Sequence, residues 1–338
     1  MRTGLFICVI AVLAVTGSAG ASQSSRTKTV PGAVESLAMD GARVAFDVEG
    51  DLPKGRCNRV RVWNVLNGAM ATASGKGTCA ADNSSTGAGV RQLAIAGTRL
   101  AWIVNVGGNS ESDDYLYTAS LPRPKEKSLA FARRVGIVGG DLAGDWIGGL
   151  AGNGRVLAVN QWRTGPKNIV TEGRLRTIGT GLHTIANGTD TIVARSTDGT
   201  KIAVLRPDGS VGLYSSSGSF LRQVTPSSAK EVALGGGYLV VLTKGASVEI
   251  YDAGTGVKIR STRVARGAGS IDLEGSLLAY RAFRAVHVLR LKTLQDLIVA
   301  RAGKSVTGVQ LEPPGLAYAW TTATGVGKLA FVPKSRLR

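Results

Sequence analysis

The stretch VEIYDAGTGVKIRSTRV, residues 248–264, alternates apolar and polar residues, turns at Gly254-Thr255-Gly256, and then alternates again. A two-residue period is typical of a β-strand with one covered face, and closely spaced glycines are typical of a tight turn. The stretch therefore predicts a β-hairpin. Whether it is one hairpin among many depends on how often the pattern recurs.

A related pattern, a short apolar strand followed by a glycine turn and a second apolar strand, occurs seven times along the chain. Successive turn glycines are 56, 57, 45, 37, 39 and 40 residues apart. These spacings are the length of a four-stranded unit, and each of the first six copies is followed by a hairpin of the opening type. The turn glycines are Gly41, Gly97, Gly154, Gly199, Gly236, Gly275 and Gly315.

Two segments carry a resemblance to known families. VEIYDAGTG and RVRVWNVLNG resemble the third strand and following turn of β-propellers, specifically the WD-repeat and bacterial YVTN-type propellers. The family's Trp-Asp dipeptide has its nearest matches here in Trp63-Asn64 and Tyr251-Asp252. The resemblance covers residues 25–338 and implies a scaffold without any particular chemistry, because function is carried by sites added to a fold.

We therefore predict an all-β fold, a seven-bladed β-propeller of four-stranded antiparallel blades. The last copy is followed by a single strand, in KLAFVPKSRLR, so the seventh blade lacks its outer strand. The segment SRTKTVP, residues 25–31, has no local partner and is predicted to complete that blade and cover its edge. The expected organisation is a signal peptide at 1–21, an N-terminal segment with the ring-closing strand at 22–32, and the propeller at 33–338.

The N-terminus has the features of a secretion signal: Arg2, an apolar run from Leu5 to Val15, and an A-x-A arrangement at Ala19 and Ala21. We expect cleavage near Ala21 and a secreted, periplasmic or cell-envelope location. An uncleaved membrane anchor is the alternative, since Leu5 to Ala21 is about as long as the shortest spanning helix. Cys8 lies too early for a lipoprotein cysteine.

The chain is 338 residues long, 43% hydrophobic and rich in glycine, which favours a globular protein with many turns. Without residues 1–21 it keeps 40 basic and 23 acidic residues, a formal charge of +17. Such a field attracts polyanions. For an exported protein we expect as partner another protein, an anionic cell-envelope polymer or a lipid surface rather than nucleic acid, and we expect a monomer. The alternative is a dispersed charge with no specific partner.

Cys57 and Cys79 are the only cysteines outside the signal. They flank a predicted hairpin whose turn falls at Asn67-Gly68, so they face each other across its open end. In an oxidising compartment this arrangement predicts a disulfide that staples the first blade. Two free thiols are the alternative.

Motifs for catalysis or cofactor binding are absent: the sequence has no G-x-S-x-G, H-E-x-x-H or EF-hand pattern, and we expect no cofactor and no metal. Both histidines, His183 and His287, are predicted to be structural. The alternative function is a lactonase-like propeller hydrolase or lyase with a divalent cation in the central channel. Its candidate ligands are Asp40, Asp198, Asp272 and Glu274, and metal analysis of the purified protein would discriminate the two classes.

The favoured function is an exported, non-catalytic binding scaffold. The second and third strands of the first three blades are joined by long connections, EGDLPKGRCN (49–58), NVGGNSESDD (105–114) and NQWRTGPKN (160–168). Such a specialised face is where propellers commonly bind ligands, with Trp162 and Arg163 as a hot-spot pair at a loop tip. Trp162 packing over a neighbouring loop is the alternative. NSESDD is expected to be a solvated acidic tip, with a calcium loop as the alternative. The predicted binding residues are Lys54, Arg56, Trp162, Arg163 and Lys167.

Overall fold

A computed structural model describes residues 25–49, 57–82, 88–108, 110–136, 142–189 and 193–337. The expected signal peptide lies outside these residues, as do Lys54 and Arg56. No helix in the described ranges is long and apolar enough to cross a membrane. Strands dominate, and every strand pairing found among these residues is antiparallel.

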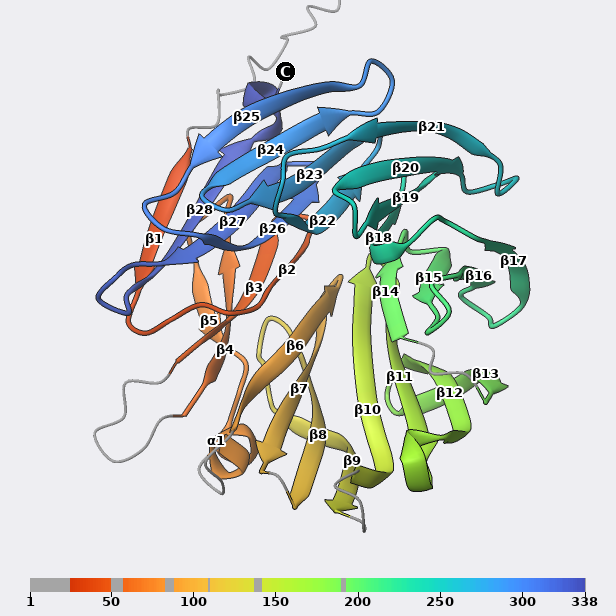
Figure 1. The fold of residues 1–338 in the computed structure, drawn as a ribbon. Coiled ribbons are helices and arrows are strands. Elements are labelled where there is room, and N and C mark those ends of the chain that lie inside the picture. The colour runs from red at the N-terminus through yellow and green to blue at the C-terminus, as the bar shows by residue number, and fades with distance from the viewer. Residues whose placement is uncertain are drawn as a thin grey trace, which may run out of the picture.

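The strands form six sheets (Figure 1). The first contains β2 (Leu37–Asp40), β3 (Arg43–Val48), β4 (Arg59–Asn64) and β5 (Met70–Thr72). The second has eight strands: β6 (Ala88–Ala96), β7 (Arg99–Gly107), β8 (Glu111–Ser120), β9 (Lys127–Gly136), β10 (Leu142–Asn153), β11 (Val156–Thr164), β12 (Val170–Ile178) and β13 (Leu182–Gly188).

The remaining four sheets have four strands each. The third contains β14 (Val193–Thr197), β15 (Lys201–Leu205), β16 (Val211–Ser215) and β17 (Phe220–Val224). The fourth contains β18 (Ala229–Gly235), β19 (Tyr238–Thr243), β20 (Ser247–Asp252) and β21 (Lys258–Arg263). The fifth contains β22 (Ala268–Glu274), β23 (Leu277–Ala282), β24 (Ala285–Arg290) and β25 (Gln295–Arg301). The sixth contains β26 (Val306–Glu312), β27 (Gly315–Thr321), β28 (Gly327–Pro333) and β1 (Arg26–Val30).

The stretch that opened the sequence analysis is the outer hairpin of one sheet, β20–β21. Val248 and Ile250 are each 1% exposed, because β20 lies between two neighbouring sheets, whereas β21 lies at the rim and is largely exposed. The Asp252 carboxylate accepts the backbone N–H of Thr255 at 2.6 Å, and Gly256 adopts φ +76°, which favours glycine. The hairpin prediction is confirmed.

The innermost strands of successive four-stranded units contact one another in the order β2, β6, β10, β14, β18, β22, β26, and β26 also contacts β2. Apolar side chains fill the space between the two halves of the second sheet, where Ile147, Leu157 and Val159 pack with Ala101 and Leu116. The prediction of an all-β propeller of four-stranded antiparallel units is confirmed. The count of seven separate blades and the closure of the ring stay predictions, which this order of contacts supports.

The N-terminal strand β1 pairs with β28, so the strand nearest the beginning of the described chain lies beside a strand near its end (Figure 1). The register runs from Arg26 opposite Phe331 to Val30 opposite Gly327. Val30 is 2% exposed, and Val34, which follows the strand, is fully buried. Residues 26–30 are thus the fourth strand of the last sheet, in the position predicted for the segment 25–31.

The structure joins Cys57 and Cys79 in a disulfide, with their Cα atoms 4.9 Å apart. Cys79 does not follow a returning strand directly, as the sequence suggested, but lies in the short helix α1 (Lys76–Asp82). The helix packs against β6 and β7 of the next sheet. The Glu126 carboxylate accepts the backbone N–H groups of Gly75 and Gly77, each at 2.7 Å. The disulfide therefore ties the first sheet to the second rather than stapling one hairpin alone.

Two of the three expected long loops are strand instead. Residues 105–107 end β7 and residues 111–114 begin β8, so the second connection is a tight hairpin. Residues 160–164 belong to β11, and the short 3₁₀ turn Pro166–Asn168 follows. The loop interpretation of these two segments was wrong, because each strand is prolonged by pairing with a neighbour. The first connection lies mainly outside the described residues.

Candidate functional site

A cavity of about 190 Å³ is lined mainly by residues of β10, β11 and β12. It lies near the connection between β11 and β12. We call it the Trp162 cavity. Its lining includes two tryptophans, three arginines and two carboxylates, together with Gln161 and, from β9, Phe131 and Ala132. The tryptophans and the charged residues are Trp146, Trp162, Arg163, Arg174, Arg176, Asp145 and Glu172.

The two tryptophans form a stacked cross-strand pair. Trp146 lies opposite Trp162 in the β10–β11 register, with ring centroids 5.7 Å apart and planes inclined by 6°. The Trp146 Nε1–H donates to Thr164 Oγ1 at 2.9 Å. A Cβ at Gly148 would lie 2.0 Å from the Trp162 ring, so this position needs glycine to accommodate the indole. The stack is thus fixed by a hydrogen bond on one ring and by a close approach on the other.

The arginines of the cavity differ in their partners. Arg163 makes a two-pronged ion pair with Asp145, at 2.7 and 3.1 Å, and this hydrogen bonding raises the pKa of Arg163. Arg174 donates to Glu172 at 2.6 Å. Arg176 instead donates to neutral oxygens, Gln161 Oε1 at 2.6 Å and Thr184 Oγ1 at 3.1 Å.

The position of Arg176 gives the cavity a positive balance. Burial, with the nearby Arg174 charge as a smaller cause, lowers the pKa of Arg176. With three guanidiniums and two carboxylates in its lining, the cavity carries one positive charge in excess. It therefore favours a ligand with a single anionic group next to a flat or apolar surface that can contact the indoles.

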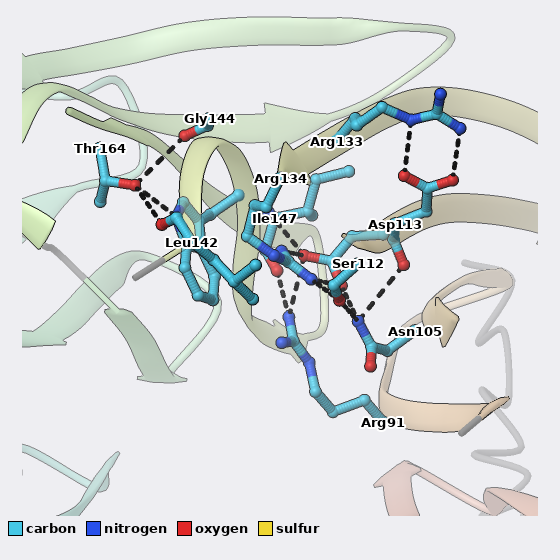
Figure 2. Close-up of polar contacts among 12 residues, drawn as sticks. Arg91, Asn105, Ser112, Asp113, Arg133, Arg134, Leu142, Gly144, Ile147 and Thr164 are labelled. Atoms are coloured by element: carbon cyan, nitrogen blue, oxygen red, sulfur yellow. Dashed lines mark hydrogen bonds and ion pairs between the residues drawn. The ribbon is translucent and has the colours of Figure 1, made fainter. Parts of the chain in front are cut away.

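Beneath the Trp162 cavity lies a buried polar network, in which Arg134, Ser112 and Asn105 converge from β9, β8 and β7 (Figure 2). At its centre are Arg134 and Asp114, whose side chains are 2% and 0% exposed and form an ion pair. The Asp114 carboxylate also accepts the Asn105 amide at 2.8 Å and the Ile147 backbone N–H at 3.2 Å.

The network supports the tryptophan stack from below. The Arg134 guanidinium carbon lies 4.0 Å from the ring centroid of Trp146, in a cation–π contact. Asp114 also accepts the backbone N–H of Ile147, and Ile147 directly follows Trp146 in β10. Arg134 and Asp114 are therefore positioning residues for the site and do not line it.

The same network corrects the expectation for the acidic segment 109–114. Asp113 and Asp114 are 7% and 0% exposed, so they do not form a solvated tip. Asp113 binds Arg133 through two hydrogen bonds of 2.9 Å, which Figure 2 shows. Both carboxylates are paired with arginines. This arrangement disfavours the calcium alternative, because a calcium ion would have to displace the arginine side chains. Asn109 lies outside the described residues.

The structure brings together only part of the predicted binding set. Trp162 and Arg163 line the cavity, from the last residues of β11 and not from a loop tip. Lys167 is exposed in the following turn, with φ 60°, and does not line the cavity. Lys54 and Arg56 lie outside the described residues. The alternation in GRLRT, residues 173–177, could have marked Arg174 and Arg176 as neighbours on one strand face.

Of the four carboxylates considered for the enzyme alternative, Asp272 lines a hollow between the innermost strands, at the place predicted for the central channel, and Glu312 lines the same hollow. Asp40 accepts the backbone N–H groups of Gly97 and of Gly154, the latter at 2.9 Å, and Asp272 accepts that of Leu311 at 2.6 Å. Glu312, which was not among the four, accepts the backbone N–H of Gly41 at 3.4 Å. Asp198 instead binds within its own turn, and Glu274 pairs with Lys334. In the described ranges no group of three or more His, Cys, Asp and Glu side chains could hold a metal ion. Asp40, Asp272 and Glu312 thus link their own strands to the backbone of other units.

These channel carboxylates predict a pH dependence of stability. Burial, with the nearby Asp272 and Asp40 charges as smaller causes, raises the pKa of Glu312 from 4.5 to about 9. Burial likewise raises the pKa of Asp272 from 3.8 to about 6. At a pH between the ordinary and the raised pKa of each group, the folded protein binds more protons than the unfolded chain. The free energy of unfolding therefore falls as pH rises through this range. The stabilisation is complete below about pH 4.5 and is lost progressively toward pH 9.

Urea unfolding of the wild type and Glu312→Gln between pH 5 and 9 measures this effect. We expect the variant, which keeps an amide in place of the protonated carboxyl, to show a weaker decline in stability across this range. Glu35→Gln is the control, because Glu35 is exposed and does not line the channel. Parallel pH profiles for the wild type and Glu312→Gln would contradict the assignment.

The two histidines occupy different environments. His287 is 6% exposed in β24, stacks on Tyr280 with centroids 4.6 Å apart, and places Nδ1 3.2 Å from the Asp296 carboxylate. The hydrogen bonds from His287 and Tyr280 outweigh burial and lower the pKa of Asp296. These contacts fit the structural role predicted for His287. His183 is exposed in β13, and its structural role stays a prediction.

Comparison with known proteins defines the class of fold. No protein-family model matches the sequence, and no curated protein does either. Solved structures do: the WD40 β-propeller domain of Doa1 matches at 12% identity over 92% of this chain and 97% of that chain, with a TM-score of 0.56. The chain thus has the fold of the WD40 β-propellers.

Two further structures agree with this class. A chain of the mitotic checkpoint complex matches at 14% identity over 99% of this chain and 100% of its own length, with a TM-score of 0.59. Saccharomyces cerevisiae Sqt1 matches at 10% identity over 90% of this chain and 98% of its own, with a TM-score of 0.52. At such low identities the likeness establishes the architecture, and the function has to be argued from the site.

Proposed function

We propose that the protein is an exported, non-catalytic propeller scaffold that binds another protein, or an anionic component of the cell envelope, on the side of the ring that holds the Trp162 cavity. The observation that carries the proposal is the stacked Trp146–Trp162 pair beside three arginines. Tryptophan and arginine are the residues most enriched at binding hot spots. One structural neighbour is, by its description, part of a multiprotein complex, which supports a role in protein binding.

The size and charge of the Trp162 cavity favour an acidic side chain of a protein partner as its occupant. Its volume of about 190 Å³ is below the range of pockets that enclose whole small molecules, roughly 300–1,000 Å³. It can take a single side chain that projects from a larger partner. The excess positive charge selects an Asp or Glu side chain, and the exposed Arg163–Asp145 pair lies at the rim, where charges govern association more than affinity.

Binding of fluorescently labelled Asp- and Glu-containing peptides to the purified protein tests the proposal. We expect Trp162→Ala/Arg163→Ala to weaken binding about tenfold or more, because both anchoring side chains are removed. Raising the salt concentration from 50 to 200 mM should weaken wild-type binding markedly, since exposed charges are screened within about 10 Å at 0.1 M. Thermal unfolding should be nearly unchanged for this variant, which alters partly exposed residues.

Trp320→Ala is the matched control. Trp320 is also a partly exposed strand tryptophan stacked on an aromatic ring, Tyr318 at 5.4 Å, but it lies in β27 in the last sheet. Peptide binding should survive this substitution. Binding retained by the double variant, or binding indifferent to salt, would move the site elsewhere on the ring.

A further inference from the structure

A second charged surface lies at the opposite ends of the strands that form the Trp162 cavity. There the turns between β6 and β7, β8 and β9, β10 and β11, and β12 and β13 come together. They enclose two hollows of about 780 and 530 Å³. The hollows adjoin, because Arg99, Gly179 and Thr180 line both of them.

The cations that line these two hollows form what we call the basic trough. No aspartate or glutamate is part of either lining. Acidic residues near these turns are engaged elsewhere: Asp40 binds the backbone N–H groups of Gly97 and Gly154, Glu126 binds the first turn of α1, and Asp198 binds the backbone N–H groups of its own turn. The cations of the basic trough are Arg99, Arg123, Lys125, Lys127 and Arg155.

Two of these cations are fixed without being neutralised. The Arg99 guanidinium donates to the backbone carbonyls of Ile178, at 2.6 Å, and Arg155. The Lys127 ammonium donates to the carbonyl of Thr180 at 3.0 Å. Carbonyl oxygens hold these side chains in place but leave their full charges uncompensated. The basic trough is therefore an ordered concentration of positive charge, and not the chance overlap of long side chains.

The turn that carries the other cations is restricted by its sequence. Arg123 stands between Pro122 and Pro124, and Lys125 follows. Each proline fixes its own φ angle and restricts the residue before it, so the turn has few conformations to lose when it binds a ligand. Arg123, Lys125, Lys127 and Arg155 are exposed and can reach a ligand directly.

The rest of the lining indicates which kind of polyanion fits. It consists mainly of hydroxyl side chains and glycines, including Thr118, Ser120, Thr200, Gly181 and Ser216. No Phe, Trp or Tyr lines either hollow, so a base-stacking platform for nucleic acid is absent there. None of the exposed large apolar residues lines them either, so insertion into a lipid surface has no anchor at this place.

We propose that the basic trough binds an anionic glycan, a polymer whose sugar hydroxyls meet the hydroxyl and backbone groups of the lining and whose acid groups meet the five cations. The concave shape, which crosses from the β6–β9 part of the second sheet to its β10–β13 part, suits a chain and not a flat membrane. The proposal does not depend on the role assigned to the Trp162 cavity.

Alginate oligomers, which carry one carboxylate on every sugar, are a suitable probe. The variant Arg123→Gln/Lys125→Gln/Lys127→Gln should bind labelled alginate about tenfold more weakly than the wild type, because three exposed charge contacts are lost together. It should also show a weaker dependence on salt. Its thermal unfolding should match the wild type, since all three side chains are exposed.

The matched control removes the same charge elsewhere. Lys244, Arg266 and Lys304 are exposed in connections of the last three sheets, and their joint replacement by glutamine should leave alginate binding within about twofold of the wild type. Trp162→Ala/Arg163→Ala should likewise bind alginate normally, which separates a failure of this proposal from a failure of the proposed protein binding.

Three results would overturn the assignment. Equal losses in the trough variant and the charge-matched control would show that the overall positive charge alone attracts alginate. Tighter binding of oligo-dT, poly-glutamate or phosphatidylglycerol vesicles than of alginate at the same salt would assign the basic trough to another class of partner. Absence of wild-type binding to alginate would exclude the glycan.

Discussion

Replacing Asp114 with alanine is expected to lower the free energy of unfolding by about 3–5 kcal/mol, a large effect for one residue. The substitution leaves the Arg134 guanidinium, 2% exposed, without its carboxylate partner. It also removes the acceptor for the Asn105 amide and for the backbone N–H of Ile147. An unpaired buried charge costs more than the pair itself contributes, so the loss should be much greater than for an ion pair at the surface.

Urea unfolding of Asp114→Ala measures the expected loss, with Asp145→Ala as the matched control. Asp145 also pairs with an arginine, Arg163, but both side chains are about half exposed, and such pairs contribute little to stability. Asp114→Ala/Arg134→Met should recover part of the stability, because it removes the unpaired charge as well. If Asp114→Ala unfolds at the same urea concentration as Asp145→Ala, the network is not a stabilising element.

Deleting residues 22–32 is expected to lower the melting temperature by several degrees and to promote aggregation. The deletion removes β1, exposes the hydrogen-bonding edge of β28, and uncovers apolar surface that Val30 covers at 2% exposure. An unpaired strand edge can pair with another molecule. Differential scanning calorimetry together with light scattering measures both effects.

Two point variants separate the strand itself from the chain before it. Val30→Asp places a charge at a buried position and should reproduce much of the deletion's effect. Thr27→Ala changes an exposed position of the same strand and should melt like the wild type. An unchanged melting curve for the deletion would show that β1 is not needed to complete the last sheet.

The propeller fold could be predicted from the sequence because its determinants are local. Each unit repeats an alternating strand and a glycine turn, and glycines such as Gly41 and Gly97 adopt φ +54° and +60° in those turns. The pairing of β1 with β28 was also predictable, because a missing strand at one end of the chain matched an unpaired strand at the other.

The candidate site was only partly predictable, because it depends on contacts between distant strands. The sequence singled out Trp162, but its partner Trp146 is set by the β10–β11 register. Asp114 and Arg134 are 20 residues apart and meet through β8 and β9 and the packing beyond them. Helix α1 was missed for a similar reason, since its first turn is held by Glu126 from a turn far along the chain.

The joined sheet β6–β13 has a consequence for how this ring could change in evolution. Propellers gain and lose whole repeats, and a repeat held to its neighbours by side-chain packing alone can be duplicated with few new contacts. Here Leu142, Ala143 and Gly144 of β10 pair with β9. The repeat β6–β9 and the repeat β10–β13 are therefore joined by backbone hydrogen bonds. Copying or removing one of them would leave an open strand edge on the other. We therefore expect the two repeats to be gained or lost together, as one eight-stranded segment that carries the Trp162 cavity on one side and the basic trough on the other.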